Sequence, residues 1–163
     1  MDGLILFSHG SVLCGAGETL RAHAERLRAR PEFGVVEIGY LNYSEPTFAE
    51  AVARCVEAGA SRIIVVPYFL VPGKFVTIDL PRAIAETQRA WPDIAFLIAE
   101  PIGYDEELAD AILEMAATAA THENWWNDLT RAAVFCEADP QCPFYGTPRC
   151  PRVPAPPMLE TVP

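Results

Sequence analysis

Basic residues are scarce in this sequence. Its 163 residues include twelve lysines and arginines but twenty-two aspartates and glutamates, which gives a formal net charge of −10. Such an acidic surface repels nucleic-acid phosphates and anionic lipids, so neither nucleic acid nor a membrane is an expected partner. The longest apolar run, residues 63–71, is interrupted by Pro67 and is too short to span a bilayer. Only a short apolar stretch precedes Ser8, so we expect no signal peptide and a cytoplasmic protein.

Nucleotide-binding motifs are also missing. The three glycines after the first apolar run have the spacing G-x4-G-x-G, which is not a dinucleotide fingerprint. Gly73-Lys74 is followed by Phe75, whereas a P-loop requires serine or threonine there. Ser8-His9-Gly10 is similar to the Arg-His-Gly motif of histidine phosphatases, but a serine replaces the arginine that would hold the phosphate. This replacement argues against phosphoryl transfer.

Short apolar runs do alternate with longer amphipathic stretches from Leu4 to about Thr121. The runs are continuous, which is typical of strands in a parallel sheet that is covered on both faces. We expect strands at residues 4–7, 35–40, 63–66 and 94–98, and helices at 18–29, 80–90 and 106–120. A further helix, with Ser44 as its N-cap, is expected before the third strand. Four βα units predict a flavodoxin-like, three-layer α/β domain over residues 1–121.

Residues 122–163 differ in composition. Eight of the fifteen prolines lie between Pro140 and Pro163. Proline cannot continue a helix or a central strand, so this part predicts an irregular C-terminal extension.

Polar and aromatic residues follow each predicted strand, in segments 8–11, 40–45, 67–70 and 100–103. Ligands of open parallel sheets bind outside the carboxyl ends of the strands, so these segments predict a shared pocket. His9 directly follows the first strand, where an imidazole can bind a metal or accept a proton. The alternative is a histidine that only caps the strand. His23 lies among charged residues of a predicted helix, which favours a solvated position.

The ordered set of motifs resembles the CbiX-type sirohydrochlorin chelatases, which are class II, ATP-independent tetrapyrrole metal chelatases. The resemblance covers about residues 3–120. It is carried by LILFSHGS at 4–11, GYLNYSEPTF at 39–48, VVPYFLVPGKFV at 65–76, DLP at 79–81 and PIG at 101–103.

The resemblance implies insertion of Co²⁺ or Fe²⁺ into sirohydrochlorin, or a related tetrapyrrole, on the way to cobalamin or sirohaem. It also implies a homodimer. His9 matches the family's first histidine, a metal ligand and proton acceptor. Ten further residues are expected to bind the substrate: Ser8, Gly10, Ser11, Asn42, Glu45, Tyr68, Phe69, Leu70, Phe75 and Asp79.

Two positions depart from the family pattern. Phe75 stands where the family has a second histidine, and Asn42 stands where it often has a glutamate. His9 must therefore act alone or with Glu45, Asp79 or a residue of the extension, while Phe75 can stack on the tetrapyrrole. The rival interpretation is a non-catalytic tetrapyrrole- or metal-binding protein that has the chelatase fold.

Three of the five cysteines, Cys136, Cys142 and Cys150, lie within fifteen residues of the extension. Their spacing does not match the C-x2-C of common zinc or ferredoxin sites. We predict an iron–sulfur cluster there, with Cys14 as a candidate fourth ligand; zinc and free thiols are the alternatives. Cys55 lies on an apolar helical stripe and is expected in the core.

Overall fold

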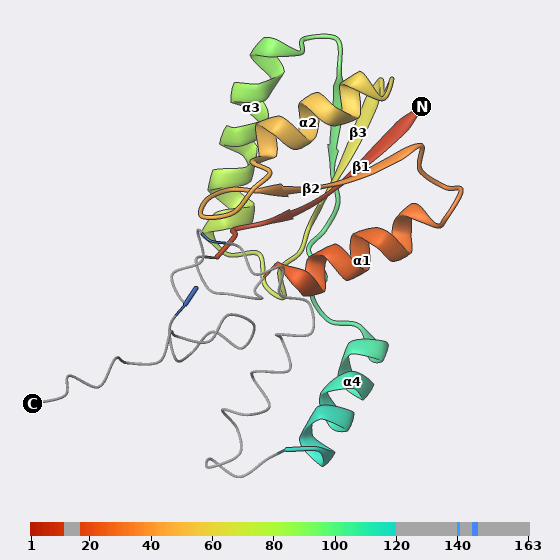
Figure 1. Ribbon diagram of the computed structural model, residues 1–163, viewed down its shortest axis with the longest axis vertical. Coiled ribbons are helices and arrows are strands. Elements are labelled where there is room, and N and C mark those ends of the chain that lie inside the picture. Colours follow the sequence, from red (N-terminus) through yellow and green to blue (C-terminus); the bar gives the residue numbers. More distant parts are fainter. Residues whose placement is uncertain (12–16, 120–139, 141–144, 147–163) are drawn as a thin grey trace, which may run out of the picture. The chain divides into compact units, whose positions relative to one another are not determined.

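The computed structural model describes residues 1–11, 17–119, 140 and 145–146. Residues 1–11 and 19–119 form one compact unit. Its centre is a four-stranded parallel sheet in the order β2-β1-β3-β4 (Figure 1). The strands are β1 (Asp2–Ser8), β2 (Val35–Tyr40), β3 (Arg62–Pro67) and β4 (Ala95–Ile98). The predicted parallel sheet is confirmed. Every strand begins and ends within two residues of its predicted bounds.

The helices are α1 (Glu18–Arg28), α2 (Phe48–Glu57), α3 (Leu80–Ala90) and α4 (Glu106–Ala117), with a π-helix, η1 (Phe75–Asp79), directly before α3. The side chains of β1 alternate between two apolar clusters. Leu4 and Leu6 pack with Leu20 and Ala24 of α1. Ile5 and Phe7 pack on the other face, in a cluster that contains residues of α2 and α3. The central strand β1 is therefore covered on both faces, as its continuous apolar run predicts, whereas the edge strand β4 is largely exposed.

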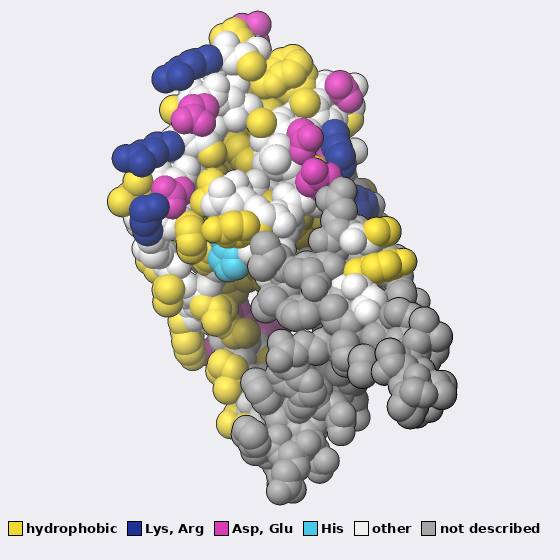
Figure 2. Space-filling view, turned by 60° about the vertical axis from the view of Figure 1, so that its left-hand side comes forward, with side chains coloured by type: hydrophobic (Ala, Val, Ile, Leu, Met, Phe, Trp, Pro, Cys, Tyr) yellow, Lys and Arg dark blue, Asp and Glu magenta, His cyan; other side chains and the backbone are white. Residues whose placement is uncertain are grey.

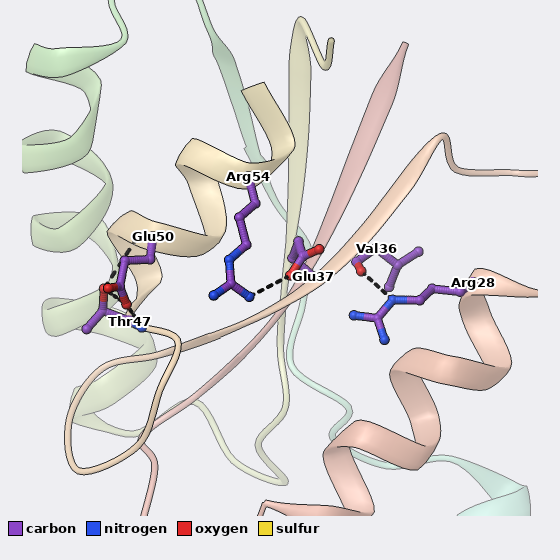
Figure 3. A network of polar contacts seen from close by, with 6 residues as sticks. All are labelled: Arg28, Val36, Glu37, Thr47, Glu50 and Arg54. Carbon is purple, nitrogen blue, oxygen red and sulfur yellow. Dashed lines mark hydrogen bonds and ion pairs between the residues drawn. The ribbon is translucent and has the colours of Figure 1, made fainter. Parts of the chain in front are cut away.

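The start of α2 corrects one sequence-based prediction. Thr47, and not Ser44, is the N-cap: its hydroxyl accepts a hydrogen bond from the Glu50 backbone N–H at 3.3 Å. The Glu50 carboxylate in turn accepts from the Thr47 N–H at 2.7 Å, which completes a capping box (Figure 3). This backbone hydrogen bond lowers the pKa of Glu50. Ser44 binds elsewhere, as described below.

Arginines connect the helices of both faces to β2 (Figure 3). Arg28 of α1 donates from Nε to the Val36 carbonyl oxygen at 2.9 Å. Arg54 of α2 lies 3.7 Å from the Glu37 carboxylate. The side chains of Val36 and Glu37 point to opposite faces of the sheet, and Val36 packs in the cluster that contains α1 residues, so α1 and α2 contact β2 from opposite sides.

The last helix, α4, has no buried residue, and Figure 1 shows it beyond the end of the sheet and not on one of its faces. Large apolar side chains of α4, such as Leu113 and Met115, are 67% and 73% exposed. No helix in the described part of the chain is long and apolar enough to cross a membrane.

Candidate functional site

The backbone brings three of the predicted segments together at the carboxyl ends of β1, β2 and β3. The ladder between β1 and β2 continues past the strands, because the N–H groups of Leu41 and Asn42 donate to the carbonyl oxygens of Ser8 and His9 at 2.9 and 3.0 Å. On the other side, the Tyr68 N–H donates to the Phe7 carbonyl oxygen at 2.8 Å. The loops that carry the candidate residues are thus fixed to the central strand.

Gly10 allows the close approach of two of these loops. Its φ is +81°, a conformation that L side chains rarely adopt, and an added Cβ would lie 1.8 Å from the Asn42 carbonyl oxygen. Next to it, the Ser44 hydroxyl accepts from the Ser11 N–H at 3.0 Å and donates to the Ser11 carbonyl oxygen at 3.1 Å. Gly10 and Ser11, both predicted to bind substrate, have a demonstrable role in joining the loops.

The hydrogen bond of His9 determines which of its ring nitrogens is available. Nδ1 donates to the Gly10 carbonyl oxygen, because a carbonyl can only accept. In the neutral imidazole, Nε2 then has no proton and can bind a metal ion or accept a proton. The side chain is exposed to solvent. Figure 2 shows a histidine at the surface with hydrophobic side chains around it.

Two phenylalanines lie next to this imidazole. The ring centroid of His9 is 5.4 Å from that of Phe75 and 6.0 Å from that of Phe69. The two phenylalanine rings are stacked, with centroids 6.0 Å apart and planes at 28°. Position 75, where the resembled family has its second histidine, is therefore next to His9 in space. In this chain it supplies an apolar ring.

The aromatic contacts continue into the core. Phe69 lies 6.1 Å from Phe7, and Phe7 lies 5.7 Å from Phe48 at the start of α2, measured between ring centroids. Phe7 is completely buried, whereas Phe75 is 39% exposed. The core thus supports the rings at the surface from beneath, and they are positioned before any ligand arrives.

For the other predicted substrate-binding residues, no hydrogen bond or ring contact with the His9 imidazole is found in the described part of the chain. Asn42, Glu45 and Leu70 are exposed. Tyr68 points to the α1 face, where its ring centroid is 5.6 Å from that of His23. The predicted exposure of His23 is confirmed, but the sequence analysis did not predict its contact with Tyr68. His23 lies three residues after Leu20, beside the buried stripe of α1, and this spacing could have indicated the contact.

Asp79 is one of the alternative partners that the sequence offers for His9, and in the structure its carboxylate pairs with Lys74. The Nζ atom of Lys74 donates to Oδ1 and Oδ2 of Asp79 at 3.1 and 3.0 Å. The side chain of Asp79 is 15% exposed and that of Lys74 is 69% exposed. The ion pair connects the residue before η1 with the last residue of that helix.

The predicted core position of Cys55 is confirmed. Cys55 is fully buried, and this burial raises the pKa of its thiol to about 12, so the thiol stays protonated near neutral pH. Cys14, Cys136, Cys142 and Cys150 lie outside the described residues. Within the described part, no three histidine, cysteine, aspartate or glutamate side chains form a group that could hold a metal ion. His9 is therefore a single exposed donor there and not part of a preformed cage.

The fold defines a parallel α/β protein, and His9 with its neighbouring aromatic rings forms a candidate ligand site at the carboxyl ends of the strands. More narrowly, the chain belongs to the CbiX family, because the sequence model of that family matches residues 3–119.

Related proteins agree with this assignment. The sirohydrochlorin cobaltochelatase of Methanocaldococcus jannaschii is 35% identical over 140 residues, covering 71% of this chain and 98% of that protein. The chloroplastic sirohydrochlorin ferrochelatase of Arabidopsis thaliana is 27% identical, and the match covers 90% of this chain but 64% of that protein.

Solved structures show the same fold. A CbiX protein of Marinobacter aquaeolei VT8 has a TM-score of 0.60 at 29% identity, covering 72% of this chain and 95% of that one. The sirohydrochlorin chelatase SirB of Bacillus subtilis subspecies spizizenii, in complex with cobalt, has a TM-score of 0.67 at 29% identity, covering 82% of this chain and 60% of that one.

Replacing Gly10 with alanine is expected to destabilise the protein much more than the same change at Gly103. Gly103 also has a positive φ, +58°, but an added Cβ would lie an ordinary 3.5 Å from the nearest atom, the Pro101 carbonyl oxygen. Gly103→Ala should therefore lower the free energy of unfolding by about 1–2 kcal/mol, the cost of placing an alanine in a left-handed backbone conformation. Gly10→Ala adds the collision with Asn42, so the free energy of unfolding should fall by more than about 3 kcal/mol.

Denaturant unfolding measures both losses in parallel. The His9 ring resonances should shift in Gly10→Ala and stay in place in Gly103→Ala. Equal losses of stability in the two variants would show that the contact between the loops does not constrain Gly10.

Proposed function

We propose that this protein is a sirohydrochlorin chelatase, a lyase that inserts Co²⁺ or Fe²⁺ into sirohydrochlorin. The observation that carries the proposal is the His9 imidazole, whose Nε2 is available beside the stacked rings of Phe69 and Phe75, in a member of the CbiX family. The names of the curated relatives support both metals, because they include cobaltochelatases and ferrochelatases.

Metal insertion poses three demands on the residues of the site. The ion must lose water ligands, the macrocycle must be held next to it, and two pyrrole protons must leave as the divalent ion enters. The neutral imidazole of His9 suits the first, because it is a ligand for both Co²⁺ and Fe²⁺. Phe69 and Phe75 suit the second, because flat aromatic faces stack and displace water.

His9 also suits the third demand. Once the ion has passed to the pyrrole nitrogens, Nε2 is released and can accept one of the two protons, while the other leaves to water. The hydrogen bond from Nδ1 to Gly10 holds the imidazole in the required tautomer. Charge is balanced, because one divalent cation replaces two protons on the macrocycle.

One observation favours the rival function, a non-catalytic tetrapyrrole- or metal-binding protein. The ring next to His9 at position 75 is phenylalanine, which can neither bind a metal ion nor accept a proton. A protein with this pair could hold a macrocycle and fail to speed metal insertion. The two functions would use the same binding site, and only the chelatase would accelerate metal insertion.

Replacing His9 with alanine is expected to lower the rate of metal insertion by at least about 100-fold, the usual contribution of a positioned acid–base group. The assay follows the absorbance change as purified protein, sirohydrochlorin and Co²⁺ or Fe²⁺ are mixed. His23→Ala is the matched control, because His23 is also exposed and also contacts an aromatic ring, but on the α1 face. If the wild-type protein binds the macrocycle without accelerating insertion, the non-catalytic function is correct.

We also propose that the protein acts as a homodimer. Large apolar side chains are exposed along β4 and α4, including Leu97 at 49%, Ile112 at 60% and Leu113 at 67%. Several large apolar side chains exposed on one protein commonly mark a protein–protein interface. One copy of this chain matches 48% of the chain of Bacillus subtilis SirB with Fe³⁺. Two copies together would therefore be comparable in length to that single chain.

Sedimentation velocity at micromolar concentration should therefore show a dimer. Leu113→Glu should shift it to a monomer, because the new charge would have to be buried in the interface. Ala49→Glu introduces the same charge at an exposed position of α2 and should leave the dimer intact. A wild-type monomer with full activity would contradict the proposal.

For the extension, we propose a metal centre at Cys136, Cys142 and Cys150, of the iron–sulfur type, in a protein of the cytoplasm. The support is the clustering of three cysteines in a proline-rich sequence, where thiolate coordination would offset the entropy lost on ordering the chain. Iron and sulfide analysis after anaerobic purification should find both elements. Protein that contains neither iron nor zinc, and in which these three thiols react freely with a thiol reagent, would disprove it.

A further inference from the structure

The chain contains a single lysine, Lys74, among its twelve basic residues. It directly precedes Phe75, whose ring lies 5.4 Å from that of His9, so it stands at the margin of the candidate site. An exposed lysine is common on protein surfaces. Here, however, the chain's only ammonium side chain directly precedes an exposed aromatic ring that lies next to His9.

The surroundings of Lys74 keep its ammonium group accessible. Its side chain is 69% exposed, whereas that of its partner Asp79 is 15% exposed. The ammonium has three N–H donors, and two acceptor contacts, to Oδ1 and Oδ2 of Asp79, are present. Asp79 is its one acceptor among the residues that the structure describes. The ammonium can therefore take a further acceptor from solvent without leaving Asp79.

The ion pair itself has little structural value. The ammonium end of the pair is exposed to water and salt, which screen its attraction to the carboxylate. Both residues belong to the segment from Lys74 to Asp79, so the pair joins no distant parts of the fold. Asp79 instead acts as a positioning residue, because its largely covered carboxylate holds the flexible lysine stem at one end of η1. The cation is thereby held beside Asp79, the last residue of η1, which begins at Phe75.

Sirohydrochlorin carries acetate and propionate side chains around its rim, and the protein has a net charge of −10. The two anions repel each other at long range, so seating the macrocycle requires a local cation. A macrocycle that stacks on Phe75 with its centre next to His9 extends past Phe75, because it is much wider than one phenyl ring. We expect its rim carboxylates to come near Lys74, because Lys74 directly precedes Phe75 in the chain.

We propose that Lys74 binds a rim carboxylate of the tetrapyrrole and so selects polycarboxylate macrocycles and sets their position over His9. This inference rests on the proposed chelatase function and adds a specificity-determining residue to it. The ammonium donates to the carboxylate while Asp79 remains its second partner. A charge-assisted hydrogen bond of this kind is among the stronger polar contacts.

The test compares Lys74→Met, which removes the charge and retains most of the length, with Lys74→Arg, which keeps the charge. Arg62→Met is the matched control: Arg62 is also an exposed cation paired with an aspartate, Asp2, but at the amino end of β3, opposite the site. Metal-free binding of sirohydrochlorin and of its fully methylated ester is titrated by absorbance at low and at high salt. The ester keeps the ring system and lacks the negative charges.

Lys74→Met should bind sirohydrochlorin about tenfold more weakly than the wild type at low salt, which corresponds to the loss of one charge-assisted contact. The ester should bind both proteins equally, and the wild-type advantage should shrink at high salt. Lys74→Arg should retain most of the affinity, and Arg62→Met all of it. In turnover, Lys74→Met should raise KM with little effect on kcat.

Two results would overturn the proposal and can be told apart. If the wild type binds and metallates sirohydrochlorin but Lys74→Met does so equally well, or if the ester loses affinity to the same extent, Lys74 does not recognise a carboxylate and the chelatase function stands. If the wild type binds no sirohydrochlorin at all, both the chelatase function and the role of Lys74 are wrong.

Discussion

The pairing of β1 with strands on both of its sides is the constraint on which the rest of the structure depends. Its register places Ser8 opposite Tyr40 of β2 and Phe7 opposite Pro67 of β3. All three strands therefore end at one level, and the loops that follow them meet there. Because side chains alternate along a strand, a shift of one residue would exchange the two apolar clusters and move the imidazole of His9 to the α1 face.

The aromatic contacts show how a rigid core supports an exposed site. Rings run without interruption from Phe48 through Phe7 and Phe69 to Phe75. This arrangement favours the binding of a flat ligand and the removal of water from around His9. It also has a chemical cost, because the position next to His9 is occupied by a ring without nitrogen. The site is consequently better equipped to hold a macrocycle than to remove two protons from it.

An ion pair lies at each end of the sheet, and the two pairs connect different parts of the fold. At the amino ends, Arg62 donates hydrogen bonds to the Asp2 carboxylate, which lowers the pKa of Asp2 and raises that of Arg62. A carboxyl group whose pKa is lowered on folding stabilises the fold above its unfolded pKa and loses this contribution as the pH falls. At the carboxyl ends, the pair of Lys74 and Asp79 lies next to a ligand site. The first pair joins β1 to β3, whereas the second joins the residue before η1 to the last residue of η1.

The order of the strands and helices, the parallel sheet, the core position of Cys55 and the place of His9 after the first strand can all be predicted from the sequence. These features depend on local periodicity, on chain connectivity and on the motifs that resemble the CbiX family. Which side chains meet depends on tertiary packing. Ser44 was expected to cap α2, but its hydroxyl bonds with Ser11, and Thr47 caps the helix. The contacts of His9 with Phe75 and of His23 with Tyr68 join residues distant in the chain, and only the packing of helices and loops against a formed sheet can bring them together.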